Sequence, residues 1–345
     1  YGRQLEGMGG GLTAVAKVCV IGRSSRPDAD VDNHFAQIPV KEQRVEWGAN
    51  CGNMSAAMGP LAVDEGLAAT HGDEALVRIH NTNTKKVIHA CFPLVSGVTA
   101  VDGHLEIPGV ARTGAPVALE FLSPGGAATG KLLPTGNVRN TQDVPGAGRI
   151  AVSMVDAANP CVFLRARDAG LTGTEQPPKV EANTEVMKKF VATRCVTSVT
   201  MGITRDLDEA ATRLTNPAIG YVAAARDWTL SYGVKRNAIE IDICARMIPR
   251  GQAHCDMPLT RALCLAVAAY IAATLVHEVT RPTQNCDTEL RIGMPACRHH
   301  HRRRASTLGE WRLGGRARLV SAHSTAPVRG QRAVAPISDK NLNLI

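Results

Sequence analysis

The spacing of apolar and polar residues changes along the chain and predicts a mixed α/β protein. Short β-branched runs typical of strands occupy 16–22 and 34–40, and two such runs over 75–94 predict a hairpin around Asn-Thr-Asn-Thr. The small apolar residues of 54–67 predict a helix, which the Gly59-Pro60 pair is expected to kink or end. The first part of the chain is therefore expected to pair a sheet with one apolar helix.

A second section with the same texture begins near residue 150. The pattern over 150–171 predicts a strand, a turn and a second strand, and 183–203 is helical in composition. A further strand is predicted at 237–247, followed by a markedly apolar helix at 262–276. Because each section combines strands with one apolar helix, we expect two similar half-domains, at 1–148 and 149–296.

The texture changes abruptly at residue 297, where an arginine-rich stretch begins. The formal net charge of the chain is +8, and all of this excess lies after residue 297. The composition predicts that 297–345 is a basic, disordered tail. A solvated tail, a nucleic-acid-binding arm and the product of a reading-frame shift all fit it, and we expect no nucleic-acid partner. Aromatic residues, at 3%, are too few for a base-stacking platform.

The cysteine pattern and the length of the apolar runs indicate in which cellular compartment the protein is expected. Ten cysteines are scattered without a C-x-x-C pair, which favours reduced thiols in a cytoplasmic protein. The first residues lack a secretory signal pattern, and a chain that begins with Tyr is expected to lack its true start. The apolar run at 262–276 is shorter than the roughly 20 residues that span a bilayer, so no membrane association is expected.

Two motifs suggest nucleotide or metal binding but lack required features. The stretch 125–131 matches most of a phosphate-binding loop, yet Leu132 replaces the hydroxyl residue that would meet Mg²⁺. The histidines of 299–301 and the run His254-Cys255-Asp256 are adjacent residues, which do not turn to one ion on regular backbone. We therefore assign no metal and no cofactor.

Cys51 stands directly before the first predicted helix. A helix N-terminus has unpaired backbone N–H groups and the positive end of the dipole, which bind a carboxylate and favour a thiolate. A lone cysteine at such a place is more often structural, and both interpretations are open on this evidence alone.

Two other positions favour a reactive site. Lys17 follows a glycine-rich stretch and has apolar neighbours, Val15, Ala16 and Val18 among them, which disfavour the charged ammonium and favour a neutral amine that can act as a base. Asn159, in a strand–turn–strand segment, is placed to donate its amide N–H to an anion, although an ordinary Asn-Pro turn also fits.

These residues belong to a set of segments that together resemble the PrpF family of 2-methylaconitate cis-trans isomerases, which includes methylitaconate, aconitate and 4-oxalomesaconate isomerases. The segments occur in the family's order and end near residue 295: EGMGGGLTAVAKV, SSRPDADVD, NCGNMSAAMGP, VRIHNTNTKKV, LSPGGAATGKLLPTGN, VSMVDAANPCVF, LTGTE, LVHEV and RIGMP. The resemblance implies an α/β fold of two pseudo-symmetric, diaminopimelate-epimerase-like half-domains. Each is a curved β-sheet around a central helix, with the substrate in the cleft between them.

The resemblance also implies a function and a site. It implies a cofactor-independent isomerase that moves a proton and a C=C bond in an unsaturated di- or tricarboxylate, with Lys17 as base and Cys51 as its partner. The implied substrate-binding residues are Gly9, Gly10, Gly11, Gly52, Asn53, Met54, Asn159, Thr260 and Gly293. The small polycarboxylate is the expected partner, and a homodimer is one expected assembly.

Some residues depart from the family pattern. An R-G-G-T-S-K-G-like segment is not found, so the first strands of the first half-domain are expected to be missing. Arg261 stands where the family tends to have Gly, and we expect its bulk to crowd the second helix start. An alternative follows from these departures: a degenerate, noncatalytic relative that binds small carboxylates.

Overall fold

The computed structural model describes residues 16–39, 45–48, 50–105, 112–281 and 290–295, and the backbone of 298–301 and 316–323. Contacts within the chain divide it into two compact units: the first runs to Leu122 and takes up the chain again from Val320, and the second is Ser123–Leu319. Each unit contains one mixed sheet and a central helix, so the expected fold class is confirmed.

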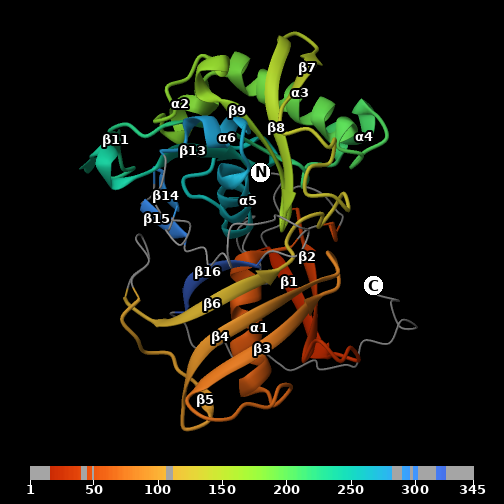
Figure 1. Cartoon of the computed structure of the whole chain (residues 1–345), viewed down its shortest axis with the longest axis vertical. Coiled ribbons are helices and arrows are strands. Elements are labelled where there is room, and N and C mark those ends of the chain that lie inside the picture. Colours follow the sequence, from red (N-terminus) through yellow and green to blue (C-terminus); the bar gives the residue numbers. More distant parts are fainter. Residues whose placement is uncertain are drawn as a thin grey trace. The chain divides into compact units, whose positions relative to one another are not determined.

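The first unit is built on a sheet with the strand order β1-β2-β3-β4-β6-β16, shown in Figure 1. Its elements are β1 (Lys17–Arg23), β2 (Val31–Gln37), α1 (Gly52–Asp64), β3 (Glu74–Asn81), β4 (Lys86–Val95), β5 (Val98–Thr99), β6 (Ala115–Leu122) and β16 (Arg316–His323). The predicted hairpin is confirmed, since β3 and β4 pair antiparallel and the Asn81–Lys86 pair closes their turn.

Helix α1 packs against this sheet, and at Gly59 it comes closest to β4. A Cβ atom built on Gly59 would lie 2.7 Å from Ala90 Cβ and 2.9 Å from Phe92 Cε1, so only glycine permits this approach to β4. The helix runs through Pro60, and the expectation that Gly59-Pro60 ends it is wrong. Close packing on the sheet stabilises the helix despite the hydrogen bond that Pro60 cannot donate.

The second unit has a sheet with the order β15-β14-β13-β10-β9-β8-β7. Its strands are β7 (Asn140–Val144), β8 (Gly148–Ala157), β9 (Asn159–Arg165), β10 (Ala218–Ala224), β13 (Ile243–Ile248), β14 (Leu290–Gly293) and β15 (Arg298–His301), with a separate pair of β11 (Trp228–Thr229) and β12 (Lys235–Arg236). Its helices are η1 (Ala166–Ala169), α2 (Pro177–Ala182), α3 (Thr184–Thr200), α4 (Leu207–Thr212), η2 (Ala238–Glu240), η3 (Pro249–Gly251), α5 (Leu259–Tyr270) and α6 (Leu275–Val279).

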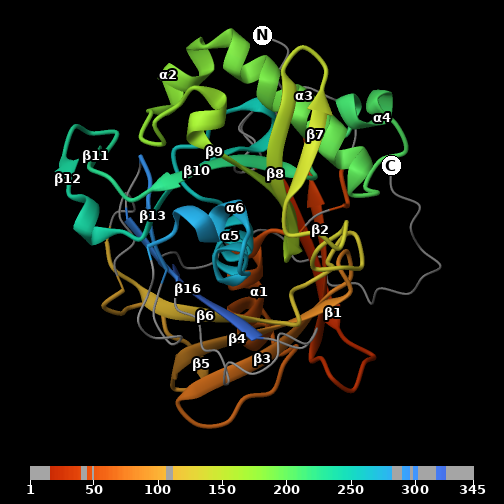
Figure 2. The ribbon, with the colours of Figure 1, turned by 45° about the horizontal axis from the view of Figure 1, so that its top comes forward.

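Both faces of the second sheet are covered, which explains why its central strands are apolar throughout. Figure 2 shows α5 and α6 beside β9 and β10, while α3 packs against β7 and β10. All residues of β13 are buried, and Phe190 of α3 stacks on Tyr221 of β10 with ring centroids 5.5 Å apart. Strands buried on both faces lose the alternation of apolar and polar residues that marks a half-exposed strand.

The two units share one structural motif. In the first, β2 and β3 pair in parallel and α1 lies between them in the chain. In the second, β13 and β14 pair in parallel and α5 and α6 lie between them. Parallel neighbours need such a crossover, so both central helices are βαβ connections, as expected for similar half-domains.

Two boundaries differ from those expected. The sequence placed the first half-domain at 1–148, whereas β7 and the loop before it belong to the second unit because β7 pairs with β8. The expected disordered tail contains the two strands β15 and β16, each of which extends a sheet. The rest of 297–345 lies outside the described residues.

The apolar run at 262–276 forms two helices instead of the single one expected. Helix α5 ends at Tyr270, and Ala273 adopts a left-handed backbone with φ of 66° before α6 begins. The side chain of Thr274 accepts a hydrogen bond from the N–H of His277 and so caps α6. None of the described helices combines the length and apolar character needed to cross a bilayer.

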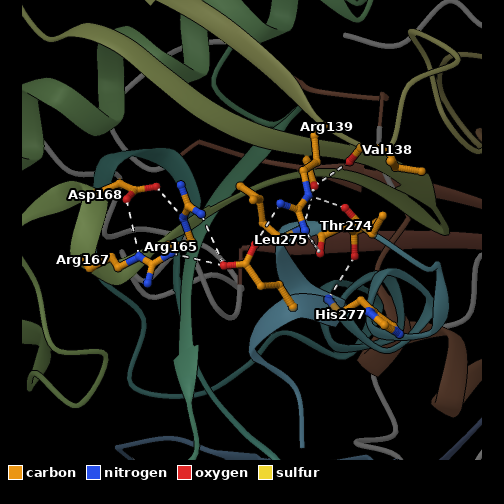
Figure 3. Close-up of polar contacts among 11 residues, drawn as sticks. Val138, Arg139, Arg165, Arg167, Asp168, Thr274, Leu275 and His277 are labelled. Atoms are coloured by element: carbon orange, nitrogen blue, oxygen red, sulfur yellow. Dashed lines mark hydrogen bonds and ion pairs between the residues drawn. The ribbon is translucent and has the colours of Figure 1, made fainter. Parts of the chain in front are cut away.

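An ion-pair cluster holds α6 in place (Figure 3). The carboxylate of Glu278 lies 2.9 to 3.3 Å from the guanidinium groups of three arginines: Arg139, Arg165 and Arg167. Arg139 also donates to the carbonyl of Ala273, next to the helix cap. Because Arg165 belongs to β9, these contacts tie the short helix α6 to the sheet.

The packing of α1 leads to a prediction for Gly59→Ala. Alanine raises intrinsic helix propensity, but its Cβ would overlap Ala90 and Phe92, and we expect a net loss of about 1–3 kcal/mol in the free energy of unfolding. Urea denaturation followed by circular dichroism measures it. Ala57→Ser, at a partly exposed position of the same helix, is the control, with an expected change within about 0.5 kcal/mol. An unchanged or increased stability of Gly59→Ala would contradict the packing described.

Candidate functional site

The start of α1 is positioned as the sequence predicts. Cys51 is the N-cap residue, with extended φ and ψ of −116° and 109°, and its side chain makes no capping hydrogen bond. The backbone N–H groups of Gly52, Asn53 and Met54 lie in the first turn, where helix geometry provides no acceptor. The helix end therefore presents donors, together with the positive end of its dipole.

Residues around Cys51 fix this helix end. The carbonyl of Cys51 accepts from the N–H of Ser55 at 2.9 Å and from its hydroxyl at 3.0 Å. The same hydroxyl lies 3.1 Å from the side-chain oxygen of the buried Asn50. The backbone at Cys51 is thus held by a small polar network rather than by the thiol.

Lys17 is the first residue of β1, and strand alternation decides where its side chain lies. Val18 and Val20 are 45% and 42% exposed, whereas Lys17, Cys19 and Ile21 are partly buried on the other face. Helix α1 contacts β1, so this second face is the one turned to the helix.

Cys19 links Lys17 to the helix start. Burial raises the pKa of the Cys19 thiol to about 12, and nearby Cys51 adds to the rise, while Lys17 in its ammonium form opposes it. Both predicted catalytic residues therefore lie within electrostatic reach of one side chain, and we call Lys17, Cys19 and Cys51 the lysine–cysteine cluster. Sequence reasoning missed Cys19, although its position two residues after Lys17 in a strand was the signal for a shared face.

In the second unit, two predicted site residues meet each other. The side-chain amide of Asn159, at the start of β9, donates to the hydroxyl of Thr260 in the first turn of α5 at 2.7 Å. Both side chains are buried. The contact joins the strand start to the helix start, so the polar groups of the two elements keep a fixed spacing.

Arg261 does not crowd the helix start, and that expectation is wrong. Its side chain is buried and donates to the carbonyl of Pro160 at 3.2 Å, to the carbonyl of Thr215 at 3.1 Å and to the side-chain oxygen of Asn216 at 3.0 Å. The guanidinium therefore forms its hydrogen bonds inside the second unit. It ties the start of β9 to α5, alongside the Asn159–Thr260 bond.

The predicted glycines have separate outcomes. Gly9, Gly10 and Gly11 lie outside the described residues. Gly293 is at the end of β14, where a Cβ atom would lie 2.5 Å from Ile241 Cδ1 and where its carbonyl accepts from Arg246. The packing alone requires glycine there, and a contact of Gly293 with substrate stays a prediction.

The loop at 125–131 is closed by an internal carboxylate. Asp156 Oδ2 accepts from the N–H of Ala128 at 2.9 Å and from the N–H and hydroxyl of Thr129 at 2.7 and 2.9 Å. These are the backbone donors that a nucleotide phosphate would need. Among the described residues, no group of three His, Cys, Asp or Glu side chains gathers as metal ligands would.

Comparisons with known proteins point to one family. A family model described as PrpF protein matches residues 1–304. The chain is 36% identical over 284 residues to the 2-methyl-aconitate isomerase of Cupriavidus necator, a match that covers 80% of this chain and 72% of that one. It is 37% identical over 296 residues to the 3-methylitaconate isomerase of Eubacterium barkeri, covering 85% and 77%.

A solved structure agrees with these relatives. The crystal structure of methylitaconate-delta-isomerase aligns with a TM-score of 0.77 at 32% sequence identity. The alignment covers 95% of this chain and 87% of that one.

The burial of the thiols predicts an order of alkylation. Cys255 is exposed and Cys51 partly exposed, whereas Cys161 and Cys264 are completely buried. We expect iodoacetamide at neutral pH to modify Cys255 and Cys51 well before the two buried thiols, as followed by peptide mass mapping over time. Protein denatured in guanidinium chloride is the control, in which all four react. Early modification of Cys161 in the native protein would contradict the burial.

Proposed function

The chain belongs to the PrpF family, and we propose that it shifts a proton and a C=C bond in a small unsaturated polycarboxylate, with Lys17 as the base and Cys51 as its partner. The curated relatives are isomerases, so the chain is an isomerase. The substrates in their names, 2-methylaconitate and 3-methylitaconate, indicate the class: an unsaturated di- or tricarboxylate. The observation that carries the residue assignment is the lysine–cysteine cluster, in which Lys17 and Cys19 share the helix-facing side of β1 and Cys51 caps α1.

The reaction makes a specific demand on the protein. A proton beside a C=C bond becomes acidic only when donors stabilise the charge that spreads over the resulting dienolate. Neutral Lys17 removes the proton from one allylic carbon, the double bond moves, and the ammonium returns the proton at the other end. Atoms and electrons balance without oxidation or reduction, so the reaction needs no redox cofactor.

Cys51 and its helix start have two tasks in this proposal. The Cys51 thiol acts as an acid toward the substrate, or as a thiolate that the helix dipole stabilises next to the reacting carbons. The first-turn N–H groups of Gly52, Asn53 and Met54 bind a substrate carboxylate, as helix N-termini bind anions. This arrangement binds a polyanion without a large basic patch.

Other residues are proposed to bind the remaining carboxylates. In the second unit these are Asn159 and Thr260, whose mutual hydrogen bond fixes the start of α5. Gly293 and the segment with Gly9, Gly10 and Gly11 complete the proposed set. The cytoplasmic location and the homodimer expected from the sequence stay predictions.

Substitution of Lys17 tests the proposal. We expect purified protein to change the ultraviolet absorbance of 2-methylaconitate or methylitaconate as conjugation changes, and Lys17→Ala to lower kcat by about 10²- to 10⁴-fold, the usual worth of a positioned acid or base. Lys188→Ala, at an exposed position of α3, is the control and should keep full activity. Equal rates for Lys17→Ala and the unaltered protein would remove Lys17 from the mechanism.

The same assay addresses the noncatalytic alternative. A chain that binds a tricarboxylate by calorimetry but turns over no member of the substrate class would be a degenerate relative. Turnover that is lost in both Lys17→Ala and Cys51→Ala, with binding retained, would exclude that alternative and support the proposed pair.

A further inference from the structure

Gln37 lies directly across the sheet from Lys17. The two residues are paired in the antiparallel register of β1 and β2. The N–H of Ile38 donates to the carbonyl of Ala16, and both backbone groups of Gln37 bond to Glu46 on its other side. Lys17 and Gln37 therefore form a non-hydrogen-bonded pair, the kind in which facing side chains come closest.

The side chain of Gln37 adds a second hydrogen bond to the Ala16 carbonyl. It is 3% exposed, and its amide nitrogen donates to the carbonyl of Ala16 at 2.8 Å. This carbonyl belongs to the peptide bond that leads into Lys17. A buried amide thus holds the backbone from which the Lys17 side chain starts, and loss of a buried donor of this kind is costly.

Gln37 also separates Lys17 from an acid. The bridge between Gln37 and Glu46 places their side chains on one face, so Lys17, Gln37 and Glu46 form a row across three neighbouring segments. Neighbouring strands are about 4.8 Å apart, which puts the Glu46 backbone about two strand spacings from Lys17. Three titratable groups are near this row: Cys19 shares the face of β1 with Lys17, Cys51 caps α1, which contacts β1, and Glu46 lies beyond Gln37.

We propose that Gln37 is a positioning residue for Lys17. Its amide fixes the strand end that carries the base, and its uncharged side chain lies between the base and Glu46. This rests on the proposed function, in which Lys17 must lose its proton before it can act. A carboxylate at position 37 would keep the hydrogen-bonding shape but stabilise the ammonium. An apolar side chain of similar length would remain neutral but would leave the Ala16 carbonyl with the N–H of Ile38 and without the side-chain donor.

Two substitutions separate these effects. Gln37→Met is expected to lower kcat by about tenfold because the base is less well placed, with KM within about twofold and the acid limb of the pH–rate profile unmoved. Gln37→Glu is expected to move that acid limb to higher pH by about one unit. Asn83→Ala is the matched control: its amide also bonds β2, at Phe35, but it does not face Lys17, and kcat should stay within about twofold.

The protonation of Lys17 can also be measured without catalysis. Acetic anhydride acylates only the unprotonated amine, so the pH dependence of Lys17 acetylation, measured by peptide mass mapping, reports its protonation directly. We expect the Gln37→Glu acetylation curve to shift to higher pH in parallel with the acid limb, and the Gln37→Met curve to match that of the unaltered protein.

The outcomes distinguish this inference from the proposed function. If Lys17→Ala stays fully active, the proposed function fails whatever Gln37 does. If Lys17 is essential, then a fully active Gln37→Met, an unshifted Gln37→Glu or an equal loss in Asn83→Ala would overturn the role of Gln37. Should Gln37→Glu fail to fold, Gln37→Met and its control decide the question.

Discussion

A β-strand turns every second side chain to the same face, and this constraint in β1 determines the site. It sends Lys17 and Cys19 to the side where α1 begins and sends Val18 and Val20 away from it. A shift of one residue in the pairing of β1 and β2 would exchange the two sets. The Lys17–Gln37 pairing, with the Gln37 amide on the Ala16 carbonyl, opposes such a shift. Stability and chemistry thus depend on the same register.

The two units repeat the same βαβ motif, but different residues stand at the start of its helix. Both central helices lie in the crossover between two parallel strands of their own sheet. The residue that caps α1 is Cys51, whereas the residue that caps α5 is Pro258. In the proposed mechanism the base and the thiol accordingly come from the first unit. The second unit offers neutral polar groups, Asn159 and Thr260, which are hydrogen-bonded to each other beside the contact of the buried Arg261 with the Pro160 carbonyl.

The sequence predicted features that depend on local chemistry. The hairpin around Asn-Thr-Asn-Thr and the helix after Cys51 follow from turn residues and apolar spacing, which act over a few positions. What it missed depends on tertiary contacts. Pro60 is tolerated because Gly59 lets α1 approach β4. Arg261 turns inward to donate to the carbonyls of Pro160 and Thr215, and a left-handed backbone at Ala273 divides an apolar run. The alternation of side chains along a strand could have placed Cys19 beside Lys17, but a cysteine in a strand resembles an ordinary small core residue.

A crystal structure of the protein with an unsaturated tricarboxylate bound would measure where the acid lies relative to the lysine–cysteine cluster. The proposed mechanism predicts one carboxylate on the N–H groups of Gly52, Asn53 and Met54, and Lys17 Nζ about 3–3.5 Å from an allylic carbon, the separation of a near-attack geometry. A ligand bound away from the start of α1, or with no allylic carbon in reach of Lys17, would contradict it.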